Sequence, residues 1–267
     1  MHNRIDDCFA RLRTQKRKGF IPYICAGDPN LKKTAELGLA LEKSGADLLE
    51  LGLPFSDPLA DGIVNQLAAQ RALAAGTNVR GVFDCVREIR KGSQIPIVLY
   101  SYLNPIFQFG AEKFRREAED AGVDGLLVLD LPPEEDGGDA AAGGIGKTNV
   151  LHIRLVAPTT PAERIEKIAK SAKGFLYYVS REGVTGARDS IATSLPEKIT
   201  ELRKFSDLPI AIGFGISTPD QAHEVARHAD AVVVGSAIVD LIAKHGNKPD
   251  VVEKVSAFAS NLAKAIH

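Results

Sequence analysis

The residues Asp47-Leu48-Leu49-Glu50-Leu51 form a short apolar run without strict alternation of polar and apolar side chains. Such a run is typical of a strand that is buried on both faces of a parallel sheet. The chain contains seven more runs of this kind, so the sequence predicts eight strands. The expected strands are Phe20–Cys25, Asp47–Leu51, Ile97–Tyr100, Gly125–Leu129, Val150–Val156, Gly174–Val179, Pro209–Gly213 and Ala231–Val234.

Segments with helical period lie between these runs, and no linker or break in composition interrupts the pattern. Alternating strand–helix units of this number predict one closed (β/α)8 TIM barrel over residues 1–267, because a doubly wound sheet usually has fewer strands or a second domain. Two helices outside these units, Ile5–Gln15 and Val251–Ala265, are expected to plug the barrel and pack on it. The other expected helices include Leu31–Ser44, Ala111–Ala121, Ala162–Ser171 and one between Gly62 and Ala74.

Composition and charge limit the classes of function. The 267 residues include 33 Lys or Arg and 34 Asp or Glu, which gives a formal net charge of -1. A general nucleic-acid or anionic-membrane binder is therefore disfavoured. Cys8, Cys25 and Cys85 are odd in number and have no metal-ligand spacing, and the histidines form no metal constellation, so neither disulfides nor a metal site are expected. Because the sequence shows neither a secretory signal nor a membrane span, we expect a cytoplasmic protein.

The chemistry of such a barrel lies at the carboxyl ends of its strands. Glu50 lies inside an apolar strand, where burial raises a carboxyl pKa toward the range useful for proton transfer. An outward-facing or salt-bridged glutamate is the alternative. Asp61 follows eleven residues later, after a loop with two prolines, and can face Glu50 across a substrate. The two carboxyl groups could then divide the roles of acid/base and hydrogen-bond acceptor.

Glycines follow each of the last three expected strands, at Gly186, Gly215 and Gly235. The loops after the last strands of a barrel, together with a helix N-terminus, commonly bind phosphate. Ser236 is expected in the capping position of the helix that follows. These features favour a phosphate site, although each glycine taken singly can serve only to allow a tight turn.

The segment Ala141–Thr148 resembles a phosphate-binding P-loop in which the first glycine is replaced by alanine. A P-loop needs a preceding strand and a following helix, whereas here the expected strand Val150–Val156 follows the glycines. We therefore interpret the segment as a loop at the opposite end of the barrel from the chemistry.

Longer motifs are similar to those of the tryptophan synthase alpha-subunit family over essentially the whole chain, in order. The most specific is Glu50-Leu51-Gly52-Leu53-Pro54-Phe55-Ser56-Asp57-Pro58-Leu59-Ala60-Asp61-Gly62, whereas the glycine turns occur in many phosphate-binding barrels. The other similar motifs are Ala26–Pro29, Asp130–Glu135, Ala157–Thr160, Tyr177–Arg181 with Gly183–Arg188, and Gly213–Ser217.

This resemblance implies retro-aldol cleavage of indole-3-glycerol phosphate to indole and glyceraldehyde 3-phosphate. It implies that Glu50 is the general acid/base, that Asp61 accepts the indole N–H, and that Tyr177 is an active-site tyrosine. The implied phosphate-binding residues are Gly186, Gly215, Gly235 and Ser236. The implied walls of the indole pocket are Tyr23, Tyr100, Leu127, Leu129, Ile153 and Phe214.

The resemblance also implies a partner, a pyridoxal-phosphate beta subunit that receives indole in an α2β2 heterotetramer. Pro54 and Asn104 lie where the family contacts this partner. No lysine has a recognisable pyridoxal-phosphate context, so no cofactor is expected in this chain. The sequence departs from the family at Ile63, where proline is usual, and at Leu99–Asn104, which lacks the common methionine. A Gly/Ala-rich stretch, Asp136–Thr148, predicts a weak fourth helix.

Two other functions remain open from the sequence. One is a free-standing indole-3-glycerol phosphate lyase that releases indole without a partner. The other is a non-catalytic regulator that binds a phosphorylated ligand and acts on a beta partner.

Overall fold

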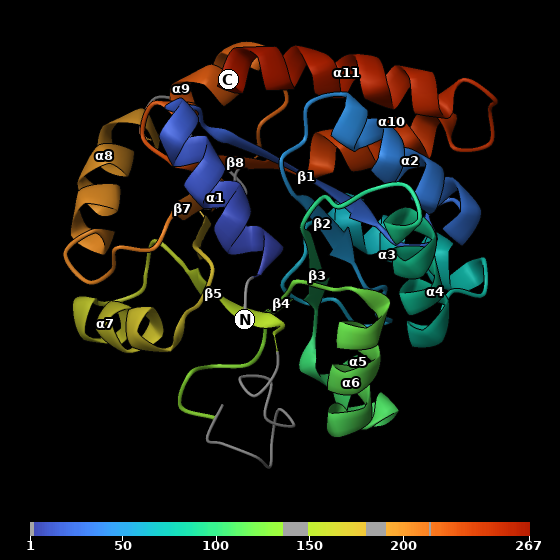
Figure 1. The fold of residues 1–267 in the computed structure, drawn as a ribbon, viewed down its shortest axis with the longest axis horizontal. Helices are drawn as coiled ribbons and strands as arrows, with labels where there is room; N and C mark the ends of the chain where they lie inside the picture. Colours follow the sequence, from blue (N-terminus) through green and yellow to red (C-terminus); the bar gives the residue numbers. More distant parts are fainter. Residues whose placement is uncertain (1–2, 136–148, 180–190, 214) are drawn as a thin grey trace.

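Eight parallel strands form a closed barrel in which the strands pair in chain order and β8 returns to β1 (Figure 1). The computed structural model describes residues 3–135, 149–179, 191–213 and 215–267. The predicted barrel is confirmed, and each expected strand agrees with the structure to within two residues at either end. The strands are β1 (Gly19–Cys25), β2 (Leu49–Gly52), β3 (Ile97–Ser101), β4 (Gly125–Val128), β5 (Leu151–Val156), β6 (Leu176–Val179), β7 (Ile210–Gly213) and β8 (Ala231–Val234).

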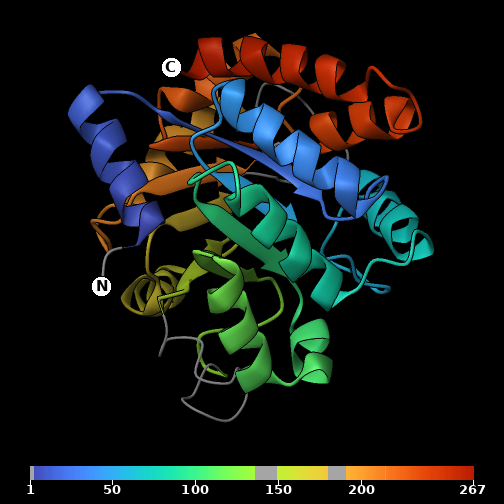
Figure 2. The same ribbon diagram turned by 45° about the vertical axis from the view of Figure 1, so that its right-hand side comes forward.

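Helices surround the strands (Figure 2). The helix predicted between Gly62 and Ala74 is α3, and the P-loop-like residues Ala141–Thr148 lie outside the described residues. Within the described ranges, no helix has both the length and the apolar character to cross a bilayer. The helices are α1 (Arg4–Gln15), α2 (Leu31–Lys43), α3 (Ile63–Ala74), α4 (Val79–Arg90), α5 (Leu103–Phe109), α6 (Ala111–Ala121), α7 (Ala162–Ser171), α8 (Ile191–Leu202), α9 (Pro219–Ala226), α10 (Ser236–His245) and α11 (Val251–Ile266).

Alternate residues along each strand face the barrel interior, because successive side chains of a strand point to opposite faces. Around β2, Leu48 and Glu50 face inward, whereas Leu49 and Leu51 pack outward against the helices. Burial on both faces explains why the strand sequences lack polar alternation. The inward apolar side chains include Ile21, Leu48, Val98, Leu127, Ile153, Phe175, Ala211 and Val233.

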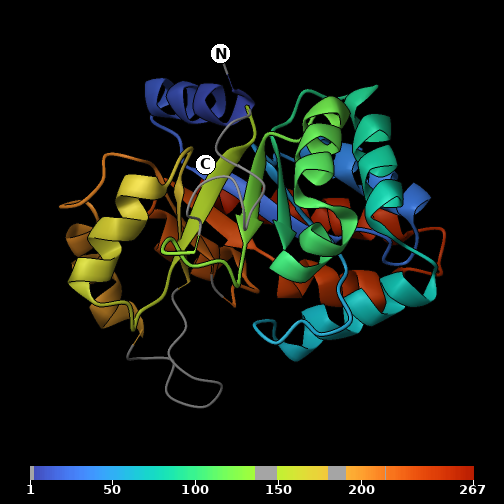
Figure 3. The ribbon, with the colours of Figure 1, turned by 90° about the horizontal axis from the view of Figure 1, so that it is seen from below.

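The first helix, α1, closes the amino end of the barrel. The Asn3 side chain caps α1 by accepting the backbone N–H of Ile5 at 2.8 Å. Figure 3 shows α1 at the opposite end of the barrel from the loop that joins β2 to α3. The helix therefore plugs the barrel as expected, whereas α11 packs on the outside against α2, α9 and α10. The α1 side chains that join the interior cluster are Ile5, Cys8, Phe9 and Leu12.

Three aspartates repeat one contact at the amino end of the barrel. Each lies just before an even-numbered strand, and its carboxylate accepts a backbone N–H at the start of the preceding strand. Such a contact fixes the register of two neighbouring strands and satisfies a backbone donor that would otherwise be unpaired. The contacts are Asp47 with Phe20 (3.1 Å), Asp124 with Ile97 (2.8 Å) and Asp230 with Ile210 (2.9 Å).

Asp124 is the most buried of these three carboxylates, with 3% of the residue exposed. Its Oδ1 accepts from Arg4 at 2.8 Å, and its Oδ2 accepts from Arg90 at 2.6 Å. Arg90 also donates to backbone carbonyls of Gly122 and Ile95. The network therefore joins α1 and α4 to the start of β3 and β4.

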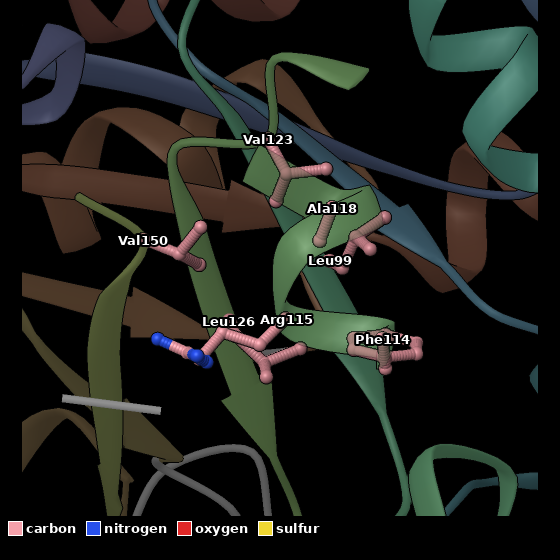
Figure 4. A pocket seen from close by; sticks show the side chains of 7 residues that line it. All are labelled: Leu99, Phe114, Arg115, Ala118, Val123, Leu126 and Val150. Carbon is pink, nitrogen blue, oxygen red and sulfur yellow. The ribbon is translucent and has the colours of Figure 1, made fainter. Parts of the chain in front are cut away.

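A small cavity lies outside the barrel, between α6 and the strands β3 and β4 (Figure 4). Its volume is about 10 Å³, close to the minimum that one water needs. Because the exposed lining is apolar, we interpret it as a gap in packing and not as a ligand site. The lining residues are Leu99, Phe114, Arg115, Ala118, Val123, Leu126 and Val150.

The Asp124 network predicts a large loss of stability in Asp124→Asn. The substitution leaves the nearly buried Arg90 without its anionic partner, which typically costs about 3 kcal/mol. Urea unfolding checks this value. Glu88→Gln, which removes an exposed ion pair with Lys91, is the control and is expected to change stability by less than about 0.5 kcal/mol. Equal effects of the two variants would contradict the assigned role of Asp124.

Candidate active site

Glu50 lies in the middle of β2 with its side chain inside the barrel, and only 2% of the residue is exposed. Its register partners are Tyr23 on β1 and Val98 on β3. This placement excludes the outward-facing alternative. Burial, and after it the nearby charge of Asp61, raises the pKa of Glu50 to about 8. Glu50 therefore carries a proton at neutral pH and can act first as an acid and then as a base.

Asp61 lies in the loop between β2 and α3, and tyrosines at the end of β3 hold its carboxylate. The Tyr100 hydroxyl donates to Oδ1 and the Tyr102 hydroxyl donates to Oδ2, each at 2.8 Å. The Ala60 N–H donates to the Tyr102 hydroxyl at 3.0 Å. Burial raises the pKa of Asp61, although the hydrogen bonds from both tyrosines and from Asn65 act in the opposite direction. The structure thus brings the two predicted carboxyl groups into one electrostatic environment.

Two buried tyrosines lie over glycines of the following strand. A Cβ at Gly52 would lie 2.3 Å from the Tyr23 hydroxyl, and a Cβ at Gly213 would lie 2.3 Å from the Tyr177 hydroxyl. Glycine is therefore needed at both positions for the tyrosines to occupy these places. Burial is the main cause that raises the pKa of Tyr177 well above its usual value, with smaller contributions from Glu50 and Asp61. The predicted catalytic residues Glu50, Asp61 and Tyr177 thus lie within one another's electrostatic influence.

The expected walls of the indole pocket lie in the barrel interior, as far as the structure describes them. The rings of Tyr23 and Tyr100 meet edge to face, with centroids 5.1 Å apart. Leu127 and Ile153 are fully buried, and Leu129 is half-buried just after β4. Phe214 lies outside the described residues.

The expected phosphate-binding residues follow β7 and β8. A Cβ at Gly215 would meet no described atom within 4 Å. Gly235 is the N-cap of α10 and Ser236 is its first residue, so the prediction that Ser236 caps the helix is wrong by one position. The first amides of a helix have no partner within the helix and can face an anion. Gly186 lies outside the described residues.

The family model described as Tryptophan synthase alpha chain matches residues 9–267. The chain belongs to the tryptophan synthase alpha-chain family. The tryptophan synthase alpha chain of Opitutus terrae is 50% identical over 261 residues, which is 97% of this chain and 97% of that relative. The alpha chain of Citrifermentans bemidjiense is 46% identical over 264 residues, 99% of this chain and 98% of its own length.

Solved structures of the tryptophan synthase alpha chain have the same fold. The alpha subunit from Legionella pneumophila str. Paris superposes with a TM-score of 0.88 at 42% identity, covering 100% of this chain and 99% of its own. As a member of this family the protein is a lyase of tryptophan biosynthesis, and the family's reaction is the cleavage of indole-3-glycerol phosphate. The family also supports the expectation that this chain has no cofactor of its own.

Two features of this alpha chain were missed from the sequence. Tyr102 lies two residues after Tyr100, and because alternate strand residues share a face, the spacing itself indicates that both can reach Asp61. The second feature is the pair of Asp28 and Arg71. Arg71 of α3 donates to the two oxygens of Asp28 at 2.9 and 2.7 Å, which joins the loop after β1 to α3 across 43 residues. No local pattern indicates that long-range pair.

The raised pKa of Glu50 predicts a pH-dependent penalty on stability. The folded protein binds this proton more tightly than the unfolded chain, so Glu50 contributes stability below about pH 4.5 that is lost as pH rises through about 8. Glu50→Gln lacks this titration. We therefore expect its stability advantage over the unmodified protein, measured by urea unfolding, to be larger at pH 8 than at pH 5 by up to about 3 kcal/mol.

The surface variant Glu88→Gln controls for general effects of losing a carboxylate. A stability difference for Glu50→Gln that stays constant between pH 5 and pH 8 would contradict the raised pKa.

Proposed function

We propose that Glu50 is the general acid/base of indole-3-glycerol phosphate cleavage. The observation that supports this best is the carboxyl group of Glu50, which is buried inside the barrel and has its pKa raised to about 8. The bond between the indole ring and the glycerol chain breaks only after the ring carbon has gained a proton, which Glu50 can supply. The carboxylate left on Glu50 can then take the proton of the glycerol hydroxyl as the carbon–carbon bond breaks. No net proton is consumed, and the products are indole and glyceraldehyde 3-phosphate.

Asp61 would accept a hydrogen bond from the indole N–H and stabilise the positive charge that develops on this ring in the transition state. Burial raises the pKa of Asp61, and the hydrogen bonds that the two tyrosines donate favour its ionised form and act against this effect. The charges of Glu50 and Asp61 both contribute to the raised pKa of Tyr177. Tyr177 would therefore line the pocket near the bond that breaks. The ring of the substrate would lie between Tyr23, Tyr100, Leu127, Leu129, Ile153 and Phe214.

The substrate phosphate would bind backbone N–H groups after the last strands. Two features support this placement: no described atom would contact a Cβ at Gly215, and the N-terminus of α10 follows β8. A few such donors suffice for one anion, which agrees with a chain whose net charge is only -1. The proposed residues are Gly186, Gly215, Gly235 and Ser236.

We also propose that the chain acts as one domain over residues 1–267, in the cytoplasm, in an α2β2 heterotetramer with a beta chain that carries pyridoxal phosphate. The elements around Asp61 carry large exposed apolar side chains, which are typical of partner surfaces. Asn104 is exposed beside them, whereas Pro54 is buried within the chain and offers little surface. The exposed side chains, which we call the apolar rim, are Leu59 (91%), Ile63 (65%), Leu67 (44%) and Phe107 (64%).

Indole release from indole-3-glycerol phosphate tests the proposed reaction, with and without a tryptophan synthase beta chain. Glu50→Gln is expected to lower kcat by 10²-fold or more, because a positioned acid/base contributes about 10²–10⁴-fold. Asp61→Asn is expected to lower kcat/KM by a similar factor, since it removes the charge that stabilises the cation. Glu88→Gln, on the surface, controls for general effects.

The same assay separates the alternatives. High turnover that a beta chain does not change would indicate a free-standing lyase. Absence of indole release by the unmodified protein in both conditions would contradict the lyase, and activation of the beta chain that survives in Glu50→Gln would then favour the regulator.

The apolar rim predicts that Phe107→Asp weakens binding of the beta chain. Removing a large exposed ring and adding a charge at an interface typically weakens affinity about 10-fold or more. Titration calorimetry with a tryptophan synthase beta chain measures the change. Lys264→Asp, an exposed substitution on α11, is the matched control. Equal affinity of both variants and the unmodified chain would place the partner elsewhere.

A further inference from the structure

We propose that Tyr100 is a positioning residue that, together with Tyr102, holds the Asp61 carboxylate in its working place before substrate binds. This inference rests on the role proposed for Asp61 and adds a second role to a residue otherwise expected only to line the indole pocket. Its evidence is a hydrogen-bonded unit, the Asp61 tether, which consists of Tyr100, Asp61, Tyr102 and Ala60.

The geometry of the Asp61 tether assigns the direction of each hydrogen bond. The Ala60 N–H donates to the Tyr102 oxygen at 3.0 Å, so the single proton of Tyr102 is free to go to Asp61 Oδ2 at 2.8 Å. Tyr100 donates to the other oxygen, Oδ1, at 2.8 Å. Because each carboxylate oxygen has its own donor, rotation of the carboxyl group would break both bonds. The two donors therefore fix the plane of the carboxylate as well as its position.

Packing holds the Tyr100 ring where its hydroxyl can reach Asp61. The ring lies on β3, in register with Gly52, and meets Tyr23 edge to face. An edge-to-face pair and a strand position leave the phenol little freedom. Tyr100 is thus a rigid donor on the barrel wall, whereas Asp61 lies on a loop. Tyr100 therefore fixes the position of Asp61, and not the reverse.

Electrostatics give the Asp61 tether a measurable consequence. Burial is the first cause that raises the pKa of Tyr100 and of Tyr102, so both phenols remain donors at neutral pH. Their hydrogen bonds lower the pKa of Asp61 against the effect of burial. Removal of the Tyr100 hydroxyl removes one of the hydrogen bonds that lower the pKa of Asp61. The pKa of Asp61 is therefore expected to rise. Within the described residues, the titratable groups that respond to the charge of Asp61 are Tyr23, Cys25, Glu50, Tyr100, Tyr102 and Tyr177.

Only Glu50 among these neighbours has a pKa, about 8, inside the range of an ordinary activity assay. Its titration would appear at the alkaline side of a pH profile. A shift at the acid side of the profile therefore reports Asp61 and not Glu50.

Tyr100→Phe tests the proposal, because it keeps the ring as a pocket wall and removes only the hydroxyl. We expect kcat/KM for indole release to fall about 10-fold, as for one hydrogen bond to a charged group, and the acid limb of the pH profile to move to higher pH. In the Asp61→Asn background the same change is expected to have less than about a twofold effect, because the charged partner is absent. Hydrogen exchange of the backbone amides in residues 57–62 is expected to be faster in Tyr100→Phe.

Tyr178→Phe is the matched control, since Tyr178 faces the outer layer of the barrel. It is expected to leave the acid limb and the exchange of residues 57–62 unchanged. The inference is overturned if Tyr100→Phe has the pH profile and amide exchange of the unmodified protein while Asp61→Asn is impaired. Absence of indole release by the unmodified protein would instead refute the proposed function, and amide exchange would still test the Asp61 tether.

Discussion

The burial of the Glu50 carboxyl group inside an apolar barrel is the constraint on which the rest of the site depends. A cation beside it would favour the ionised form and remove the proton that cleavage requires. Within the described part of the chain, no Lys or Arg is among the causes that shift the pKa of Glu50 or Asp61. Neutral phenol groups supply the polar contacts instead. The phenol groups favour the anionic form of Asp61, and because they carry no positive charge they leave the pKa of Glu50 raised by burial.

The barrel separates the groups that hold it together from the groups proposed to react. Asp47, Asp124 and Asp230 bind backbone N–H groups at the amino end, and α1 closes that end with apolar side chains. Charges there have partners, so they contribute to register and stability. The carboxyl end instead keeps a buried carboxyl group without a cation, at a cost in stability. The strong network at one end offsets the destabilised group at the other.

The fold and the buried place of Glu50 were predictable because both depend on local patterns. Strands buried on both faces have continuous apolar runs. A glutamate at an inward position of such a run is therefore expected to lie in the barrel interior. The rest depends on contacts between distant segments. Ser236 is the first residue of α10 and not its cap, and no local pattern near Pro54 indicates that this chain buries it. The pairing of Asp28 with Arg71 has no local signal at all.

The loop that carries Asp61 shows why its position is not encoded locally. Gly62 is the N-cap of α3 and has no side chain to cap it, and Ile63 lacks the ring with which a proline would restrict the backbone. Ordering each loop residue costs about 1–2 kcal/mol, so the backbone alone would leave Asp61 free to move. Tyr100 and Tyr102, at the end of β3, donate hydrogen bonds to Asp61 and so fix the loop. Asp28, in the loop after β1, accepts a hydrogen bond from Arg71 and so fixes α3. The position of Asp61 therefore depends on two strands and one helix, and a change in any of them can displace the carboxylate without direct contact with it.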